Sequence, residues 1–499
     1  MSARLRFREL LEQAPDDVAA INFEGAWTTW GTLRSVASSL DAALDAHGLG
    51  SGARVGLVIE NRPEHVAVII ALLATDRTVV TFSSLQPPAR LSADIERSNV
   101  PAVVGTARVL GLDGVTEAAG RALVLELSAD SVDQRRPGER TTPHPQDISP
   151  GVAIEMLTSG TTGPPKRVLL GERQFDTALS TSVPEPPKTG LFRSGVSIVC
   201  TPIVHIGGFW GAVSPLYAGR RIVLFPRFLL DPWVESVAEH RPRAAGLVPA
   251  ALRAVLAADI PAEKLAGLEV ITTGTTFCPS DLVDAFLDRY GIRILSNYGA
   301  TEFAGAIASW TRSLHEKWWA AKAGAAGRAM PGVTLRVTGP EGAELPVGET
   351  GILEVRSAQS PVGGDAWQRT SDLASIDEDG FLWIRGRADD AIIRGGFKVQ
   401  PETVKSALER HSAVREAAVA PLADERLGAV PVAAVELEPG AAVPEAEELR
   451  QFCRDALLPY EVPVHVVVLD ALPRTPSLKV SRVELMELIQ AELEPGVSV

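Results

Sequence analysis

Hydroxyl, glycine and lysine side chains gather in one short stretch between residues 157 and 168. The stretch follows the apolar run Val152–Ile154, so we expect a strand that ends in a polar loop. Glycine lets backbone N–H groups approach a phosphate, hydroxyls donate hydrogen bonds to phosphate oxygens, and lysine supplies a mobile positive charge. This composition indicates a loop that binds nucleotide phosphates, with the candidate residues Thr158, Ser159, Gly160, Thr161, Thr162, Gly163 and Lys166.

The spacing of these residues differs from that of a Walker A loop. That motif needs four residues between its glycines and a Gly-Lys-Ser/Thr ending. Here two residues separate Gly160 from Gly163, and Arg167 follows the lysine. Composition alone also fits a surface linker rich in Ser, Thr, Gly and Pro. The prediction of a phosphate-binding loop therefore depends on motifs in other parts of the chain.

Two further stretches carry groups that suit phosphate or acid chemistry. Thr301 and Glu302 set a hydroxyl beside a carboxylate, a pair that suits a phosphate-bound Mg²⁺ because this ion prefers oxygen ligands. Taken alone, the same pair is typical of a helix start. His205 lies between an apolar run and the pair Gly207 and Gly208. A lone histidine in such a place is more often a core residue than a functional one.

Length, charge and cysteine content narrow the class of protein. A chain of 499 residues with 45% hydrophobic content predicts two or more domains. The net charge of −14 argues against nucleic acids and membrane surfaces as partners and favours small molecules. The three cysteines are far apart without a CxxC, which fits a reducing cytosol and predicts a cytoplasmic protein. The longest apolar run, Val66–Ala74, is too short for membrane insertion.

The elements that must position these residues follow an α/β pattern. Apolar spacing predicts a helix over 32–47, and apolar runs predict a strand over 55–59, a helix over 64–74 and a strand over 78–82. Strand, helix and strand in this order imply a parallel βαβ unit. The stretch 130–150 is interpreted as a surface connection. The last part of the chain reads as a small α+β domain, with helices over 401–410 and 445–457 and strands over 417–419, 430–435 and 464–469.

Seven segments in order resemble the motifs of the adenylate-forming ligases, the superfamily of acyl-CoA synthetases, peptide-synthetase adenylation domains and luciferases. They are TSGTTG-x-PK from Thr158, Pro-x-x-His-x-x-Gly at 202–208, a Gly-Gly-Ala-like segment at 273–275, Tyr-Gly-x-Thr-Glu at 298–302, Thr-Gly-Asp at 370–372, Gly-Arg-x-Asp at 386–389, and Pro-x-Thr-x-x-Gly-Lys at 473–479. Departures from the family pattern are Arg167, Thr273, Thr275, Ser371, Thr403 and Leu478.

The resemblance implies a role for each matching residue, with ATP and Mg²⁺ as cofactors. The expected catalytic residues are Lys479, Thr301, Glu302 and His205, and Glu302 is also the expected metal ligand. Besides the residues of the phosphate loop, the expected ATP-binding residues are Gly274, Thr275, Tyr298, Asp372 and Arg387. Asp372 would bind the ribose. The residues expected to line the acid pocket are His205, Phe209, Trp210 and Gly299. Asp389 is the expected hinge residue, and Gly395 and Gly396 would leave room for an acceptor tunnel.

The resemblance also implies an architecture and a reaction. We expect an α/β fold with a large multi-subdomain N-terminal adenylation domain (1–388, the ATP and acid site) and a small mobile α+β C-terminal lid domain (389–499). A small carboxylic acid, aryl or alkyl, would form an acyl-adenylate, and CoA would then displace AMP. Two alternatives stay open: an amine acceptor, which makes the protein an amide bond synthetase, and a non-catalytic nucleotide-binding relative.

Overall fold

The computed structural model describes residues 1–138, 145–157, 166–182, 187, 189–395, 397–475 and 479–493. These residues form two compact units. The first consists of described residues within Met1–Ser159, Pro165–Thr334 and Arg356–Gln368, and the second of those within Leu335–Val355 and Arg369–Val499. This division differs from the boundary at 388/389 that the motifs suggest, and that boundary stays a prediction.

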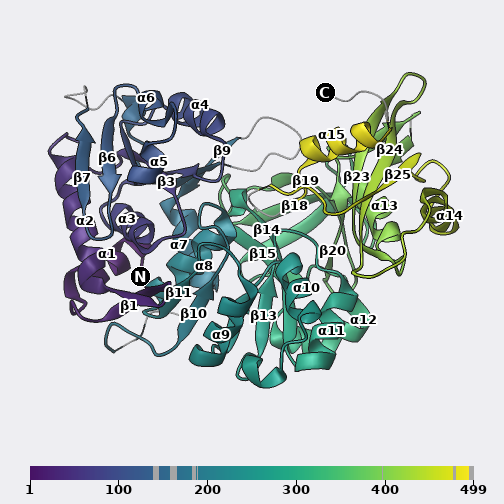
Figure 1. The fold of residues 1–499 in the computed structure, drawn as a ribbon, viewed down its shortest axis with the longest axis horizontal. Coiled ribbons are helices and arrows are strands. Elements are labelled where there is room, and N and C mark those ends of the chain that lie inside the picture. The colour runs from purple at the N-terminus through teal and green to yellow at the C-terminus, as the bar shows by residue number, and fades with distance from the viewer. Residues whose placement is uncertain are drawn as a thin grey trace. The chain divides into compact units, whose positions relative to one another are not determined.

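A mixed sheet in the order β7-β6-β5-β3-β4-β8-β9 is the core of the first unit, with its inner strands parallel (Figure 1). Alternate residues of β3 enter opposite layers, because Val55 and Leu57 pack with α3 while Val58 packs with α4. The predicted βαβ unit is therefore confirmed. The elements are β3 (Arg54–Ile59), α3 (Pro63–Ala74), β4 (Thr78–Ser83), α4 (Pro88–Ser98), β5 (Ala102–Thr106), α5 (Ala107–Leu110), α6 (Val115–Ala118), β6 (Leu123–Leu127), β7 (Val132–Arg136), β8 (Val152–Leu157), β9 (Arg167–Gly171), and the helices α1 (Ala3–Gln13) and α2 (Trp30–Asp45).

The interpretation of 130–150 as a plain surface connection is wrong in part. β7 pairs antiparallel with β6 from Val132 to Arg136 and forms the edge of the sheet. Its central residues are polar and exposed, so the strand lacks the apolar alternation on which the sequence argument relies. Backbone pairing at a sheet edge needs no such alternation.

Two smaller sheets complete the first unit, with the orders β10-β11-β1-β2 and β12-β13-β14-β15-β16. Their strands are β1 (Ala19–Phe23), β2 (Ala26–Thr29), β10 (Val196–Val199), β11 (Arg221–Leu224), β12 (Ala244–Gly246), β13 (Val270–Thr273), β14 (Arg293–Ala300), β15 (Gly305–Ser309) and β16 (Arg328–Ala329). The helices are η1 (Pro145–Asp147), α7 (Glu172–Ser182), α8 (Ile206–Tyr217), α9 (Leu230–His240), α10 (Pro249–Ala257), η2 (Ala262–Leu265), α11 (Ser280–Tyr290), η3 (Thr301–Phe303) and α12 (Arg312–Lys322).

The second unit contains a sheet β17-β18-β19-β20 and a sheet β22-β21-β24-β23, to which β25 adds by pairing with β24. The predicted α+β pattern of the tail is confirmed. The helix α15 was not predicted from the sequence. The elements are β17 (Val333–Thr338), β18 (Gly351–Ser357), β19 (Gln368–Ile376), β20 (Leu382–Arg387), β21 (Ile392–Arg394), β22 (Phe397–Val399), α13 (Pro401–Leu408), β23 (Val414–Asp424), β24 (Gly428–Leu437), α14 (Ala446–Ala456), β25 (His465–Leu469) and α15 (Arg482–Leu493).

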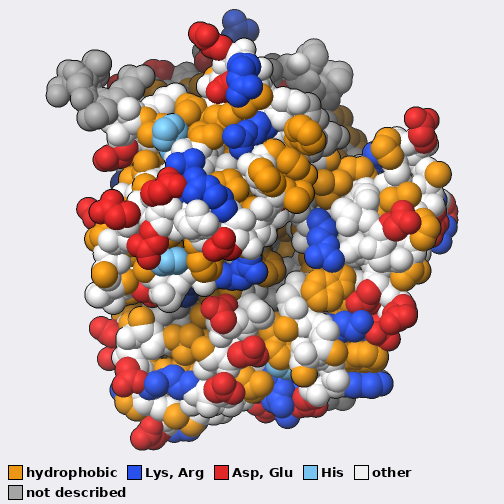
Figure 2. Space-filling model, turned by 90° about the vertical axis from the view of Figure 1, so that its right-hand side faces the viewer, with side chains coloured by type: hydrophobic (Ala, Val, Ile, Leu, Met, Phe, Trp, Pro, Cys, Tyr) orange, Lys and Arg blue, Asp and Glu red, His pale blue; other side chains and the backbone are white. Residues whose placement is uncertain are grey.

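The surface carries charges of both signs. Figure 2 shows Lys and Arg side chains interspersed with Asp and Glu over the face that it presents. A search of the described residues for a helix long and apolar enough to cross a membrane finds none.

Candidate functional site

The Thr301–Glu302 pair lies on a short 3₁₀ turn, η3, between the antiparallel strands β14 and β15. Gly299 approaches the opposite strand so closely that a Cβ there would stand 2.0 Å from the Gly305 carbonyl oxygen. Only glycine fits this approach, and this explains the Tyr-Gly step of the motif. The turn leaves Thr301 half-buried and the Glu302 side chain exposed, which suits a carboxylate that receives an ion from solvent.

Two side chains from other elements donate hydrogen bonds to this turn. The Trp210 Nε1 atom of α8 donates to the Ala304 carbonyl oxygen at 2.6 Å. The Gln174 Nε2 atom of α7 donates to the Glu302 carbonyl oxygen at 3.4 Å. Trp210 is a predicted acid-pocket residue, whereas Gln174 was not predicted from the sequence as a site residue. No local signal would have found it, because its partner lies 128 positions away in the chain.

His205 occupies the N-cap position of α8 in an extended backbone conformation, without a capping side-chain hydrogen bond among the described residues, and its side chain is half-buried. The glycine pair after it lies in the first turn of α8. Glycine is needed at position 208 because a Cβ there would stand 2.1 Å from the Pro202 carbonyl oxygen. Phe209, another predicted pocket residue, is wholly buried in the core and packs edge-to-face on Phe175. The neighbouring Trp210 stacks on the same ring with centroids 4.6 Å apart.

The predicted adenine segment is a turn directly after β13. Thr275 adopts a left-handed backbone conformation (φ 70°) and has an exposed side chain. A Cβ on Gly274 would stand 3.4 Å from the Asn297 carbonyl oxygen in β14. A Cβ on Gly207 would stand 3.9 Å from the Thr275 methyl group. The first unit therefore brings together the start of α8, the turn at 274–275 and the end of β14 with η3.

Asp372 and Arg387, the predicted ribose and phosphate residues, lie opposite each other on β19 and β20 of the second unit. The Arg387 guanidinium donates to both carboxylate oxygens of Asp389, at 2.9 and 2.7 Å. This pairing raises the pKa of Arg387 and holds the pKa of Asp389 below its usual value. The predicted hinge residue is therefore an ion-pair partner of a predicted ATP ligand.

Lys479 follows the segment 476–478, which lies outside the described residues. The Thr475 backbone N–H donates to the Lys479 carbonyl oxygen at 2.7 Å, and Arg474 bridges to Val480. These backbone contacts join the described residues on either side of that segment, and Lys479 is half-buried. Gly395, a predicted acceptor-tunnel residue, has a left-handed backbone conformation (φ 56°) that favours glycine, and Gly396 lies outside the described residues.

The predicted phosphate loop, from Thr158 to Gly163, also lies outside the described residues. Its flanking strands are paired, with Leu157 of β8 opposite Arg167 of β9, and Lys166 has an exposed side chain. Arg167, which replaces a family glycine, donates to Asp94 at 3.0 Å and lies over the Phe82 ring. The departure therefore has a packing role in the sheet.

The described residues hold no group of three or more His, Cys, Asp or Glu side chains that would bind a metal by themselves. The exposed Glu302 and the Thr301 hydroxyl still fit Mg²⁺, because this ion keeps several waters and commonly takes one or two carboxylates plus substrate phosphates. The three cysteines are buried, which raises the pKa of each thiol to about 12 for Cys200 and Cys278 and about 11 for Cys453. Protonated thiols of this kind are poor nucleophiles.

The sequence profile of the AMP-binding enzyme family matches residues 7–361, and that of the AMP-binding enzyme C-terminal domain matches residues 403–479. The chain therefore belongs to the AMP-binding enzyme family of adenylate-forming ligases. Indoleacetate–CoA ligase of Aromatoleum aromaticum is 32% identical over 385 residues, which are 73% of this chain and 71% of that protein. Sulfoacetate–CoA ligase of Cupriavidus necator is 30% identical over 92% of each chain.

A solved structure that resembles this fold belongs to an enzyme with a different acceptor. The amide bond synthetase McbA from Marinactinospora thermotolerans is 26% identical, with a TM-score of 0.80 over 97% of this chain and 99% of that one. Relatives therefore include both CoA ligases and an amide bond synthetase.

Proposed function

We propose that this protein uses MgATP to convert a small carboxylic acid to an acyl-adenylate and then transfers the acyl group to the thiol of CoA. The acid's carboxylate attacks the α-phosphorus of ATP, and pyrophosphate leaves. The CoA sulfur then attacks the acyl carbon, and AMP leaves with the electron pair of the broken C–O bond. Membership of the AMP-binding enzyme family supports the first half-reaction, and the named CoA ligases among the relatives support the second.

The observation that carries the proposal is the grouping of motif residues in the first unit. η3 carries an exposed carboxylate beside a hydroxyl, and the turn at 274–275 and His205 at the start of α8 lie near the same strand end. We assign Glu302 to hold the metal, Thr301 to donate to phosphate and His205 to border the acid. Mg²⁺, when bound, would neutralise phosphate charge.

The second unit supplies the remaining roles in this proposal. Asp372 would accept hydrogen bonds from the ribose hydroxyls, and Arg387 would contact ribose or phosphate. Lys479 would place its ammonium on the charge that develops at the α-phosphate, where preorganised charge lowers the barrier most.

A second acceptor class is an amine, which would give an amide. The likeness to McbA favours this candidate. An amine must lose a proton when it attacks, and His205 is the base that we assign to that step. CoA is the first candidate because the relatives named above as sequence matches are both CoA ligases.

The test has two stages. Pyrophosphate release is first measured with a panel of aryl and alkyl carboxylic acids, and we expect release with at least one acid. No release with any acid would favour a non-catalytic nucleotide-binding relative. With acyl-AMP formed, CoA and a simple amine are then supplied at matched concentrations and the products are read by mass. Thioester at low CoA supports the proposal, and amide without CoA saturation overturns its acceptor.

A further inference from the structure

Gln174, near the start of α7, uses every polar group of its side-chain amide to join three backbone segments. Its Oε1 atom accepts from the Gly171 N–H at 2.9 Å. Its Nε2 atom donates to the carbonyl oxygens of Gln359 at 2.9 Å and Glu302 at 3.4 Å. The side chain is 7% exposed, so water competes little for these bonds. One buried amide therefore joins the end of β9, the segment at 359 and the η3 turn.

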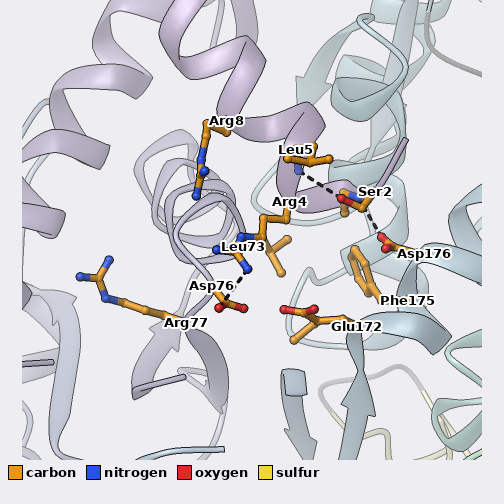
Figure 3. A pocket seen from close by; sticks show the side chains of 12 residues that line it. Ser2, Arg4, Leu5, Arg8, Leu73, Asp76, Arg77, Glu172, Phe175 and Asp176 are labelled. Carbon is orange, nitrogen blue, oxygen red and sulfur yellow. Dashed lines mark hydrogen bonds and ion pairs between the residues drawn. The ribbon is translucent and has the colours of Figure 1, made fainter. Parts of the chain in front are cut away.

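The helix that carries Gln174 is held in place by contacts of the two residues that follow it. Phe175 stacks on Trp210, and Asp176 accepts a hydrogen bond from the Ala3 backbone N–H at 2.8 Å. Phe175 and Asp176 border a cavity of about 350 Å³. Figure 3 shows them facing this cavity together with residues of α1 and α3. Gln174 is not among the residues that line this cavity. Its amide is thus presented to η3 from a fixed helix.

The η3 turn accepts hydrogen bonds from two side chains outside it. It is three residues long, and its closing bond runs from the Ala304 N–H to the Thr301 carbonyl oxygen at 2.9 Å. Trp210 holds the turn at residue 304, and Gln174 holds it at the backbone of Glu302. The bond from Gln174 fixes the peptide from which the exposed carboxylate projects.

We propose that Gln174 is a positioning residue for MgATP: by holding the Glu302 backbone it sets where the carboxylate meets a metal-bound triphosphate. The inference rests on the proposed role of Glu302. Groups that orient a metal ligand without touching the metal are typically worth 10- to 100-fold in affinity or activity. The ligand class is a nucleoside triphosphate with a divalent cation, as distinct from a nucleoside monophosphate.

The experiment compares Gln174→Met with Gln174→Glu and with the matched control Gln359→Met. Methionine is similar in size and lacks both the donor and the acceptor. Glutamate keeps the acceptor for Gly171 but, at pH 8, has no N–H to donate. Gln359 is also buried, at 1% exposure, and its side-chain amide has no hydrogen-bond partner among the described residues. Its substitution changes the same neighbourhood without removing a bond to η3.

Binding of MgATP and of AMP is measured by calorimetry on each full-length variant, beside the Mg²⁺ dependence of pyrophosphate release. Both Gln174 variants should bind MgATP about 10- to 100-fold more weakly, while AMP affinity stays within threefold of wild type. Gln359→Met should match wild type for both ligands. Equal losses for MgATP and AMP, an unchanged MgATP affinity, or the same loss in Gln359→Met would overturn the inference. Wild type that binds MgATP but releases no pyrophosphate would overturn only the proposed reaction.

Discussion

At the residue scale, Asp76 and Glu172 form a carboxyl pair at the cavity in Figure 3. Their shared hydrogen bond, together with burial and the charge of Asp76, raises the pKa of Glu172 to about 7. Burial raises the pKa of Asp76, but the hydrogen bonds with Glu172 and Ser51 and the Arg4 guanidinium, 3.0 Å away, lower it overall, and Asp176 is a further acid nearby. The pair therefore retains one proton at pH values where an exposed glutamate is ionised.

The first prediction concerns stability against pH. The folded-state pKa of Glu172 is raised, so its contribution to stability is complete below the unfolded value near 4.5 and is lost as the pH rises through about 7. Denaturant midpoints of wild type should therefore fall between pH 5 and 8 more than those of Glu172→Gln, which cannot titrate there. Parallel pH profiles of the two proteins would contradict the shared proton.

The second prediction concerns Lys479. Lys479→Ala should slow adenylation about 100-fold or more, because a transition-state charge contact of this kind is worth ~3 kcal/mol. Transfer from preformed acyl-AMP should suffer less, since the phosphoryl step is then complete. Each half-reaction is measured separately by rapid quench, and Lys264→Ala, at an exposed position, serves as control. Equal losses in both half-reactions would assign Lys479 a different role.

At the scale of elements, the third prediction concerns the hairpin β14–η3–β15. Gly299→Ala places a methyl group 2.0 Å from the Gly305 carbonyl oxygen, so the two strands must separate. We expect a loss of about 3 kcal/mol or more in the free energy of unfolding, at the upper end for overpacked sites, with weaker MgATP binding.

The control for this hairpin variant is Gly50→Ala. No atom lies within 4 Å of a Cβ at Gly50, and its backbone is not left-handed. Its unfolding free energy should stay within about 0.5 kcal/mol of wild type. A Gly299→Ala protein as stable as Gly50→Ala would show that the hairpin adjusts without strain.

Elements with a clear apolar pattern were predictable, and those without one were not. β3, α3 and β4 follow from their continuous apolar runs, because nearly all of their residues are buried in the core. β7 could not be predicted in this way because its central residues are polar and exposed, and the strand is placed by backbone pairing with β6 and by the ion pair of Arg135 with Glu126. The same limit applies to η3, which is too short for any period and is recognisable only through the Tyr-Gly-x-Thr-Glu string.

At the scale of the whole molecule, the fourth prediction concerns the proposed hinge at Asp389, between β20 and β21. Asp389→Pro fixes the φ angle at this position, so one half-reaction should survive while the other fails. Asp389→Ala is the control, because it removes the ion pair with Arg387 but leaves the backbone free. Both half-reactions are assayed in each variant, and equal impairment of the two by proline would argue against a hinge here.

The amino-acid sequence by itself determined the family, the α/β class and the order of the motifs, because short strings such as Tyr298–Glu302 keep their residue types wherever the fold places them. Only the tertiary structure decided how these residues are held. The ion pair of Arg387 with Asp389 and the stack of Trp210 on Phe175 depend on folded geometry. Gln174 is the clearest case, since its carbonyl partners lie 128 and 185 positions away. A backbone carbonyl is present at every residue, so no sequence pattern marks the ones that folding brings to a buried amide.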